Sequence, residues 1–167
     1  MGNDRIKAPS NPYFAYRKRA ARCNMALSSR ESAAELLGVS ASSLSDYELG
    51  NTKVVPPDKV SLMSKLYCAP ELRNWYCKNE CPIGKELVMA DHIGSLEGIA
   101  LKLLRGLDED DMDSVKKAIV EIFEDGFVAE SEIGMLGYVT NHLKKMQEAI
   151  SELLLVSEKY GGSRDEC

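Results

Sequence analysis

The chain has 167 residues and a formal net charge of −5, with 44% hydrophobic and 28% charged residues. That length suits one or two small domains, and that composition is typical of a globular protein rather than a disordered one. The chain has only two histidines, and its glycines are too scattered to form a phosphate-binding loop. The sequence therefore does not match the active-site patterns of most enzymes. We therefore predict a protein without enzymatic activity. Its apolar runs are short and no signal-peptide pattern opens it, so we expect it in the cytoplasm.

The charge is divided unevenly along the chain. Residues 1–80 hold 12 Lys and Arg against 8 Asp and Glu, whereas residues 81–167 hold 9 against 18. A basic half suits a polyanionic partner, and an acidic half does not. The asymmetry therefore predicts two modules with different partners.

The first half predicts a flexible arm at 1–11 followed by five short helices. N-cap serines, first-turn prolines and helix-ending glycines define these helices, and no segment alternates with a period of two. The fold class is therefore all-α. The predicted helices span 12–24, Ser28 or Ser29 to Leu37, 41–48, 56–66 and 71–79.

The second half predicts a linker at 82–92, an acidic helical domain at 93–160 and a flexible tail at 161–167. Helical spacing places one helix at 93–107, another after the acidic turn 108–111, and a long final helix. The final helix carries a seam typical of bundles and coiled coils, which would form a helical hairpin, a three-helix bundle or a contact between two chains. The seam consists of Leu136, Val139, Leu143, Met146, Ile150 and Leu153.

One stretch meets the requirements of a helix-turn-helix. Such a motif needs a small residue where two helices cross and, four positions later, a turn residue that tolerates left-handed backbone. Ala34 and Gly38 supply these, and Ser40 can cap the second helix. The apolar anchors on the two sides of the turn are Leu37, Val39 and Leu44.

This stretch resembles the lambda-repressor-like, Cro-type helix-turn-helix family, also called the xenobiotic-response-element family. The resemblance covers roughly residues 12–67 and includes Leu-Gly-Val-Ser at 37–40, Leu-Ser-x-Tyr-Glu at 44–48 and Gly-x-x-Lys-x-x-Pro at 50–56. It implies a five-helix, lambda-repressor-like DNA-binding domain over residues 12–81. The implied function is sequence-specific transcription regulation through binding to double-stranded DNA, with the protein acting as a homodimer and its acidic domain dimerising or binding a protein partner or effector.

The resemblance also implies roles for individual residues. The positions facing the DNA bases are Ala41, Ser42, Ser45 and Asp46. The positions contacting the DNA backbone are Arg30, Ser43, Asn51, Lys53 and Arg17, with additional charge from Lys18, Arg19 and Arg22.

The base-facing positions depart from the family, which usually places Gln, Arg, Asn or Lys at one or more of them. A bidentate base contact is worth about 1–3 kcal/mol of discrimination, and neither Ala nor Ser can make one. We therefore expect modest specificity per half-site, with affinity supplied by dimerisation or DNA shape.

Other interpretations of the same residues remain open. The two-helix corner is compatible with a structural turn, the basic helix with a solvated face, and the whole chain with a protein-interaction adaptor. Cys68, Cys77 and Cys81 favour reduced thiols over a metal or redox site, because no histidine lies near them in sequence. His92 and His142 show no partner pattern, and we predict no cofactor and no metal.

Overall fold

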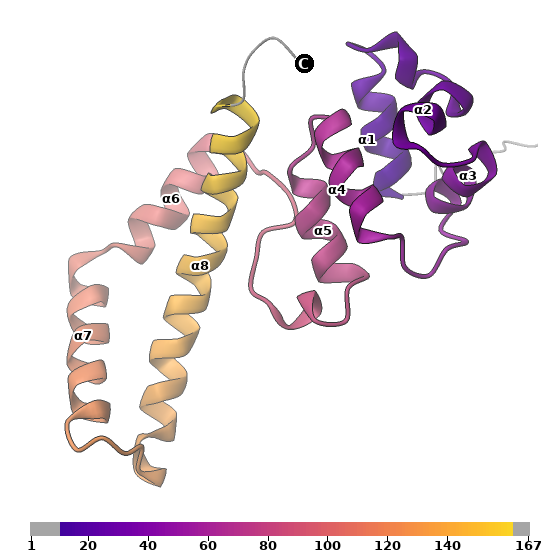
Figure 1. Ribbon diagram of the computed structural model, residues 1–167. Helices are drawn as coiled ribbons and strands as arrows, with labels where there is room; N and C mark the ends of the chain where they lie inside the picture. The colour runs from indigo at the N-terminus through magenta and orange to yellow at the C-terminus, as the bar shows by residue number, and fades with distance from the viewer. Residues whose placement is uncertain (1–10, 162–167) are drawn as a thin grey trace, which may run out of the picture. The chain divides into compact units, whose positions relative to one another are not determined.

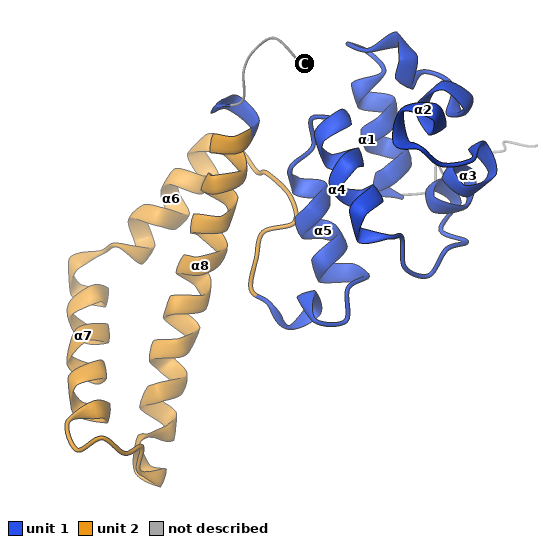
Figure 2. Cartoon of the chain, viewed as in Figure 1, with its two compact units in different colours: residues 1–87, 159–167 blue, residues 88–158 orange. Residues whose placement is uncertain are grey.

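A computed structural model describes residues 11–161, and all of the regular structure in this range is helical. The predicted all-α class is confirmed for these residues. The chain divides into two compact units, Met1–Leu87 with Lys159–Cys167, and Val88–Glu158 (Figure 2). We call them the N-terminal and C-terminal units and describe each by itself. The predicted arm and tail lie outside the described residues, apart from Asn11 and Gly161.

The N-terminal unit contains five α-helices (Figure 1). Their bounds are α1 (Pro12–Ala20), α2 (Arg30–Leu37), α3 (Ala41–Leu49), α4 (Pro57–Leu66) and α5 (Glu71–Asn79). Helix α1 ends at Ala20, earlier than predicted: a turn follows at residues 21–23, and the Asn24 side chain then accepts the Ala26 N–H at the start of a separate 3₁₀ turn, Met25–Leu27. The other four helices begin and end within two residues of their sequence signals.

This unit has a substantial buried core built from every helix. Two polar side chains add long-range links between its elements. The Asn11 Nδ2 donates to the Tyr47 carbonyl at 2.8 Å, and the Glu80 carboxylate accepts the Tyr13 hydroxyl and the Val55 N–H, both at 2.9 Å. Burial and the Glu80 charge raise the pKa of Tyr13, so that phenol stays a donor. The buried apolar residues are Tyr13, Leu27, Ala33, Ala34, Leu37, Leu44, Val55, Val60, Met63, Tyr67, Ala69, Leu72 and Tyr76.

The C-terminal unit is a helical hairpin in which one side consists of two successive helices and the other of a single long helix. Helix α6 (Leu96–Gly106) and helix α7 (Glu109–Phe123) lie along the two halves of the long helix α8 (Ile133–Gly161) (Figure 1). Its core cluster is small and consists of Val115, Ala118, Ile122 and Val139. No helix within residues 11–161 is long and apolar enough to cross a membrane.

The predicted seam on α8 coincides only in part with the face that packs inside this unit. Val139 is buried, but Leu143, Ile150 and Leu153 are exposed. The buried positions instead include Ala149 and Glu152, so the inward stripe is displaced around the helix from the predicted one. A two-helix layer covers only one stripe of each helix, which leaves the other apolar stripe open.

Candidate nucleic-acid interface

Local hydrogen bonds explain the tight corner between α2 and α3. Ser29 and Ser40 cap the two helices by accepting backbone N–H groups, and Gly38 ends α2 at a φ of 60°, in the left-handed region that favours glycine. The ammonium of Lys59, from α4, donates to the Leu37 carbonyl at 3.0 Å. A cation at the carboxyl end of a helix is favourable, so Lys59 braces the corner.

The four predicted base-facing residues lie along α3 and differ in their exposure. Ser42 and Asp46 are exposed, whereas Ser45 and Ala41 are half-buried and Ala41 packs against the core. The Asp46 carboxylate accepts a hydrogen bond from the Asn51 side chain at 3.0 Å. Asp46 was predicted to contact a DNA base and Asn51 the DNA backbone, and in the structure the two side chains are hydrogen-bonded to each other.

The serine hydroxyls at the start of α3 also bond locally. The Oγ atoms of Ser42 and Ser43 lie 2.9 and 2.8 Å from the Ser40 Oγ, which also accepts the Ser43 N–H. These contacts occupy part of the hydrogen-bonding capacity of the hydroxyls. Lys53 is exposed in the segment after α3, as a backbone contact would require.

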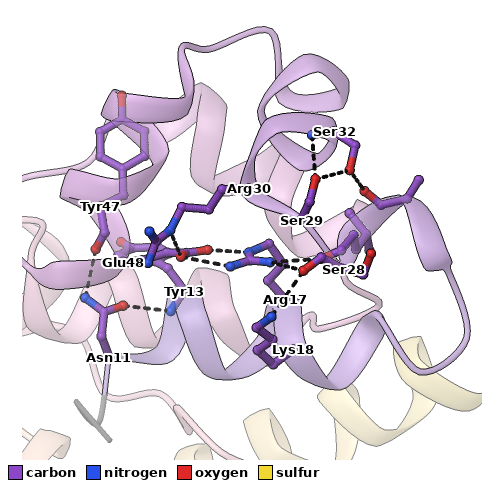
Figure 3. Close-up of polar contacts among 12 residues, drawn as sticks. Asn11, Tyr13, Arg17, Lys18, Ser28, Ser29, Arg30, Ser32, Tyr47 and Glu48 are labelled. Atoms are coloured by element: carbon purple, nitrogen blue, oxygen red, sulfur yellow. Dashed lines mark hydrogen bonds and ion pairs between the residues drawn. The ribbon is translucent and has the colours of Figure 1, made fainter.

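Below the start of α2, one buried carboxylate holds two arginines (Figure 3). Glu48, on α3, has no exposed side-chain surface. It accepts the Nε and Nη2 of Arg17 from α1 and, at 2.7 Å, the Nε of Arg30 from α2. One buried negative charge thus faces two positive ones, leaving an excess of positive charge at this point of the unit.

The two arginines differ in exposure, and this difference corrects one prediction. The Arg17 side chain is 2% exposed, and its Nη1 also donates to the carbonyls of Leu27 and Ser28. Its predicted role as a DNA-backbone contact is wrong, because its hydrogen-bonding groups face the interior. The Arg30 side chain is 36% exposed and bound through Nε, which leaves its terminal nitrogens for another partner.

The remaining basic residues of α1 point to different places. The Lys18 ammonium lies 3.1 Å from the Ser28 carbonyl, two residues before Arg30 in the chain (Figure 3). Arg19 instead pairs with Glu71 of α5 at 3.0 Å and lies over the Tyr16 ring. The structure therefore brings Lys18 and Arg30 to the start of α2 and directs Arg19 elsewhere.

Sequence reasoning missed Glu48 and Lys59. A signal existed for Glu48, because it follows the core residue Leu44 by four positions and must share its inward helix face. No signal existed for Lys59, which reaches the Leu37 carbonyl from a helix 22 positions away in sequence.

The cysteines divide into two kinds. Cys77 and Cys81 are free thiols that pack against the core, and burial raises the pKa of Cys77 with a further contribution from Cys81. Cys68 is disulfide-bonded, so the expectation of a reduced thiol is wrong there. Within residues 11–161 no group of three His, Cys, Asp or Glu could hold a metal ion.

Comparison of the chain with protein-family models, curated proteins and solved structures gives no match.

Proposed function

We propose that this protein is a DNA-binding transcription regulator, with a lambda-repressor-like N-terminal unit that binds duplex DNA through α2 and α3. The observation that carries the proposal is the half-exposed Arg30, which lies at the start of α2 and is held there by the buried Glu48 of α3. The capped α2–α3 corner and the surrounding five-helix arrangement support the same family resemblance.

The start of α2 has the chemistry that a DNA phosphate requires. Arginine presents a planar fork of donors that matches phosphate oxygens, and the first turn of a helix adds the positive end of its dipole. Lys18 supplies a second cation near the same turn. Because Glu48 fixes the Nε of Arg30, less side-chain freedom is lost on binding a phosphate.

Base reading by α3 is weak in this proposal. Asp46 is the one charged group at the four base-facing positions, and a carboxylate, which can only accept hydrogen bonds, is the usual partner of the cytosine amine. Asn51 bonds the Oδ1 of Asp46, which leaves Oδ2 to accept from a base. Phosphate contacts therefore position the domain, and DNA shape supplies part of the sequence preference.

The C-terminal unit would join two chains. The proposed contact is an apolar flank, formed by Leu96 and Leu104 on α6, by Leu107 directly after it, and by Leu143, Ile150 and Leu154 on α8, all of them exposed. A helix turns about 100° per residue, which places each set on one side of its helix. An isologous contact would cover this flank on both chains at once and bring two α3 helices to one duplex.

A protein-interaction adaptor is the second candidate, and one observation favours it. The base-facing positions carry one Ala and two Ser, and the Ser42 hydroxyl is bonded to the Ser40 cap. Near the same helix the apolar side chains of Leu49 and Val54 are exposed. This surface could contact another protein without contributing to base recognition.

Selection from a random duplex library with the full chain separates the two candidates. The regulator predicts enrichment of two half-sites whose centres lie about 10 base pairs, or a multiple, apart. Asp46→Asn should raise affinity for unselected DNA and shift the preferred base at one position away from cytosine. An absence of binding at low salt, with the helices intact by circular dichroism, would favour the adaptor.

A further inference from the structure

A cavity opens in the C-terminal unit between α6, the start of α7 and α8. Its volume is about 460 Å³, within the range of roughly 300–1,000 Å³ found for small-molecule sites. Met146 and Ala149 give it an apolar floor, and Gly106 adds no side chain that would fill it. The Nε2 of His142 lies 3.1 Å from the Gly106 carbonyl, which can only accept, so Nε2 is the donor and joins the two helices at one wall.

Basic side chains are concentrated in the lining of this cavity, although the unit as a whole is acidic. Residues 88–158 contain six Lys and Arg, and three of these line the cavity. Lys102 already forms an ion pair, because its ammonium lies 2.7 Å from the buried carboxylate of Glu152. Arg105 and Lys145 form no ion pair with any residue in the described part of the chain.

Two carboxylates share the lining. Asp111 comes from α7 and Glu148 from α8, and neither forms an ion pair among residues 11–161. A simple anion in the cavity would face these two acids, and a simple cation would face Arg105 and Lys145. A ligand with both charges satisfies both pairs, and the apolar floor requires an apolar body between or beside them.

We propose that this cavity binds a small zwitterion with an apolar body, of the size of a large amino acid. Arg105 and Lys145 would bind its carboxylate, and Asp111 and Glu148 its ammonium group. Met146 and Ala149 would contact the apolar part. In a DNA-binding regulator such a ligand would be an effector, and this last consequence alone depends on the proposed function.

The cavity and the apolar flank do not compete for the same surface. About 100° per residue places Lys145 and Glu148 on the side of α8 away from Leu143 and Ile150. The corresponding residues of α6, Lys102 and Arg105, lie away from Leu96 and Leu107 in the same way. A second copy on the apolar flank would therefore leave the cavity open.

Calorimetric titration of the full chain with L-phenylalanine tests the proposal. Two matched probes accompany it: 3-phenylpropanoate, which lacks the ammonium group, and L-phenylalaninamide, which lacks the carboxylate. We expect one site per chain for L-phenylalanine and about tenfold weaker binding of each analogue, the loss of one charge-assisted contact.

Variants localise the site. Lys145→Gln and Glu148→Gln should each weaken L-phenylalanine binding about tenfold. Lys144→Gln, which changes the neighbouring exposed lysine outside the cavity lining, should leave it unchanged. The absence of saturable binding, equal affinity for the two analogues and L-phenylalanine, or insensitivity to both cavity variants would each overturn the proposal. Because no DNA is used, such a failure would leave the proposed function standing.

Discussion

The two units use apolar residues in opposite ways. The N-terminal unit encloses thirteen buried apolar residues in one cluster, whereas the main cluster of the C-terminal unit has four. Leu96 and Leu104 on α6 and Leu107 directly after it remain more than half exposed, each of them a residue that would normally stabilise a core. The comparison indicates that five helices arranged around one another enclose a core, whereas a hairpin leaves much of its apolar surface exposed.

Both units nevertheless contain one fully buried glutamate held by cations. Glu48 is shared by Arg17 and Arg30, and Glu152 accepts the Lys102 ammonium and the Gly94 N–H. Buried ion pairs give little net stability but penalise any arrangement that separates them. In each unit the pair therefore helps to specify how its helices meet.

The largest effect is expected in the N-terminal unit. Glu48→Ala leaves the buried Arg17 without its counter-charge and should lower the free energy of unfolding by about 3–5 kcal/mol. Denaturation followed by the fluorescence of Trp75, the single tryptophan, reports this unit alone. Glu31→Ala, at an exposed glutamate of α2, should change the value by less than about 0.5 kcal/mol. Equal effects of the two variants would refute the importance of the Glu48 network.

The next effect concerns the apolar flank of the C-terminal unit. Leu143→Glu places a charge in the proposed contact and should weaken dimerisation by about 2–3 kcal/mol, more than tenfold in the dissociation constant. Light scattering across a concentration series measures this shift. Leu62→Glu, at a comparably exposed leucine on α4, serves as the control. If the unmodified chain is a monomer at tens of micromolar, a range of about −6 to −7 kcal/mol, the proposed contact is wrong.

A smaller effect is expected at the α2–α3 corner. Lys59→Met keeps the apolar stem but removes the donor to the Leu37 carbonyl, and should destabilise the N-terminal unit by about 1 kcal/mol. The Trp75 transition measures this change too. Lys65→Met, at an exposed lysine on the same helix, should have no comparable effect, and equal losses from both variants would show that Lys59 does not brace the corner.

The smallest effect is a pH dependence confined to the C-terminal unit. Burial opposes ionisation of Glu152, but Lys102 and the Gly94 N–H favour it more strongly and hold its pKa below the ordinary value of 4.5. Its contribution is present above that value and is lost as the pH falls through the lower folded-state pKa. Glu152→Gln should flatten the acid limb of helix stability measured by circular dichroism, whereas Glu148→Gln should not. A limb unchanged by Glu152→Gln would assign the acid sensitivity to other groups.

The fold could be predicted where signals are local. Ser29, Ser40, Gly38 and Gly50 begin or end α2 and α3 through contacts within a few residues, so the sequence alone located both helices. Contacts between distant segments were not predictable in this way. Arg17 looked like a surface cation on a basic helix, and only its meeting with Glu48, 31 positions away, turns it inward.

In the C-terminal unit, too, local sequence signals predicted the position of a helix but not its contacts with distant segments. The spacing of apolar residues identified α8 but not which of its two adjacent stripes packs inside the unit. Leu143 and Val139 are equally good seam residues by periodicity, yet only Val139 meets Val115 and Ile122 of α7. The positions of α6 and α7 along α8 determine which of its two apolar stripes is buried. The periodicity of a single helix does not reveal those positions.

The proposal that the N-terminal unit binds DNA at the start of α2 is tested most directly by a salt series. Affinity of the full chain for duplex DNA is measured by anisotropy for wild type, Arg30→Ala and Arg19→Ala, two arginines of similar exposure that are both ion-paired. We predict that Arg30→Ala weakens binding to every duplex and reduces the slope of log affinity against log salt by about one, while Arg19→Ala changes neither. Identical affinity and slope for wild type and Arg30→Ala, with both proteins folded, would contradict the account.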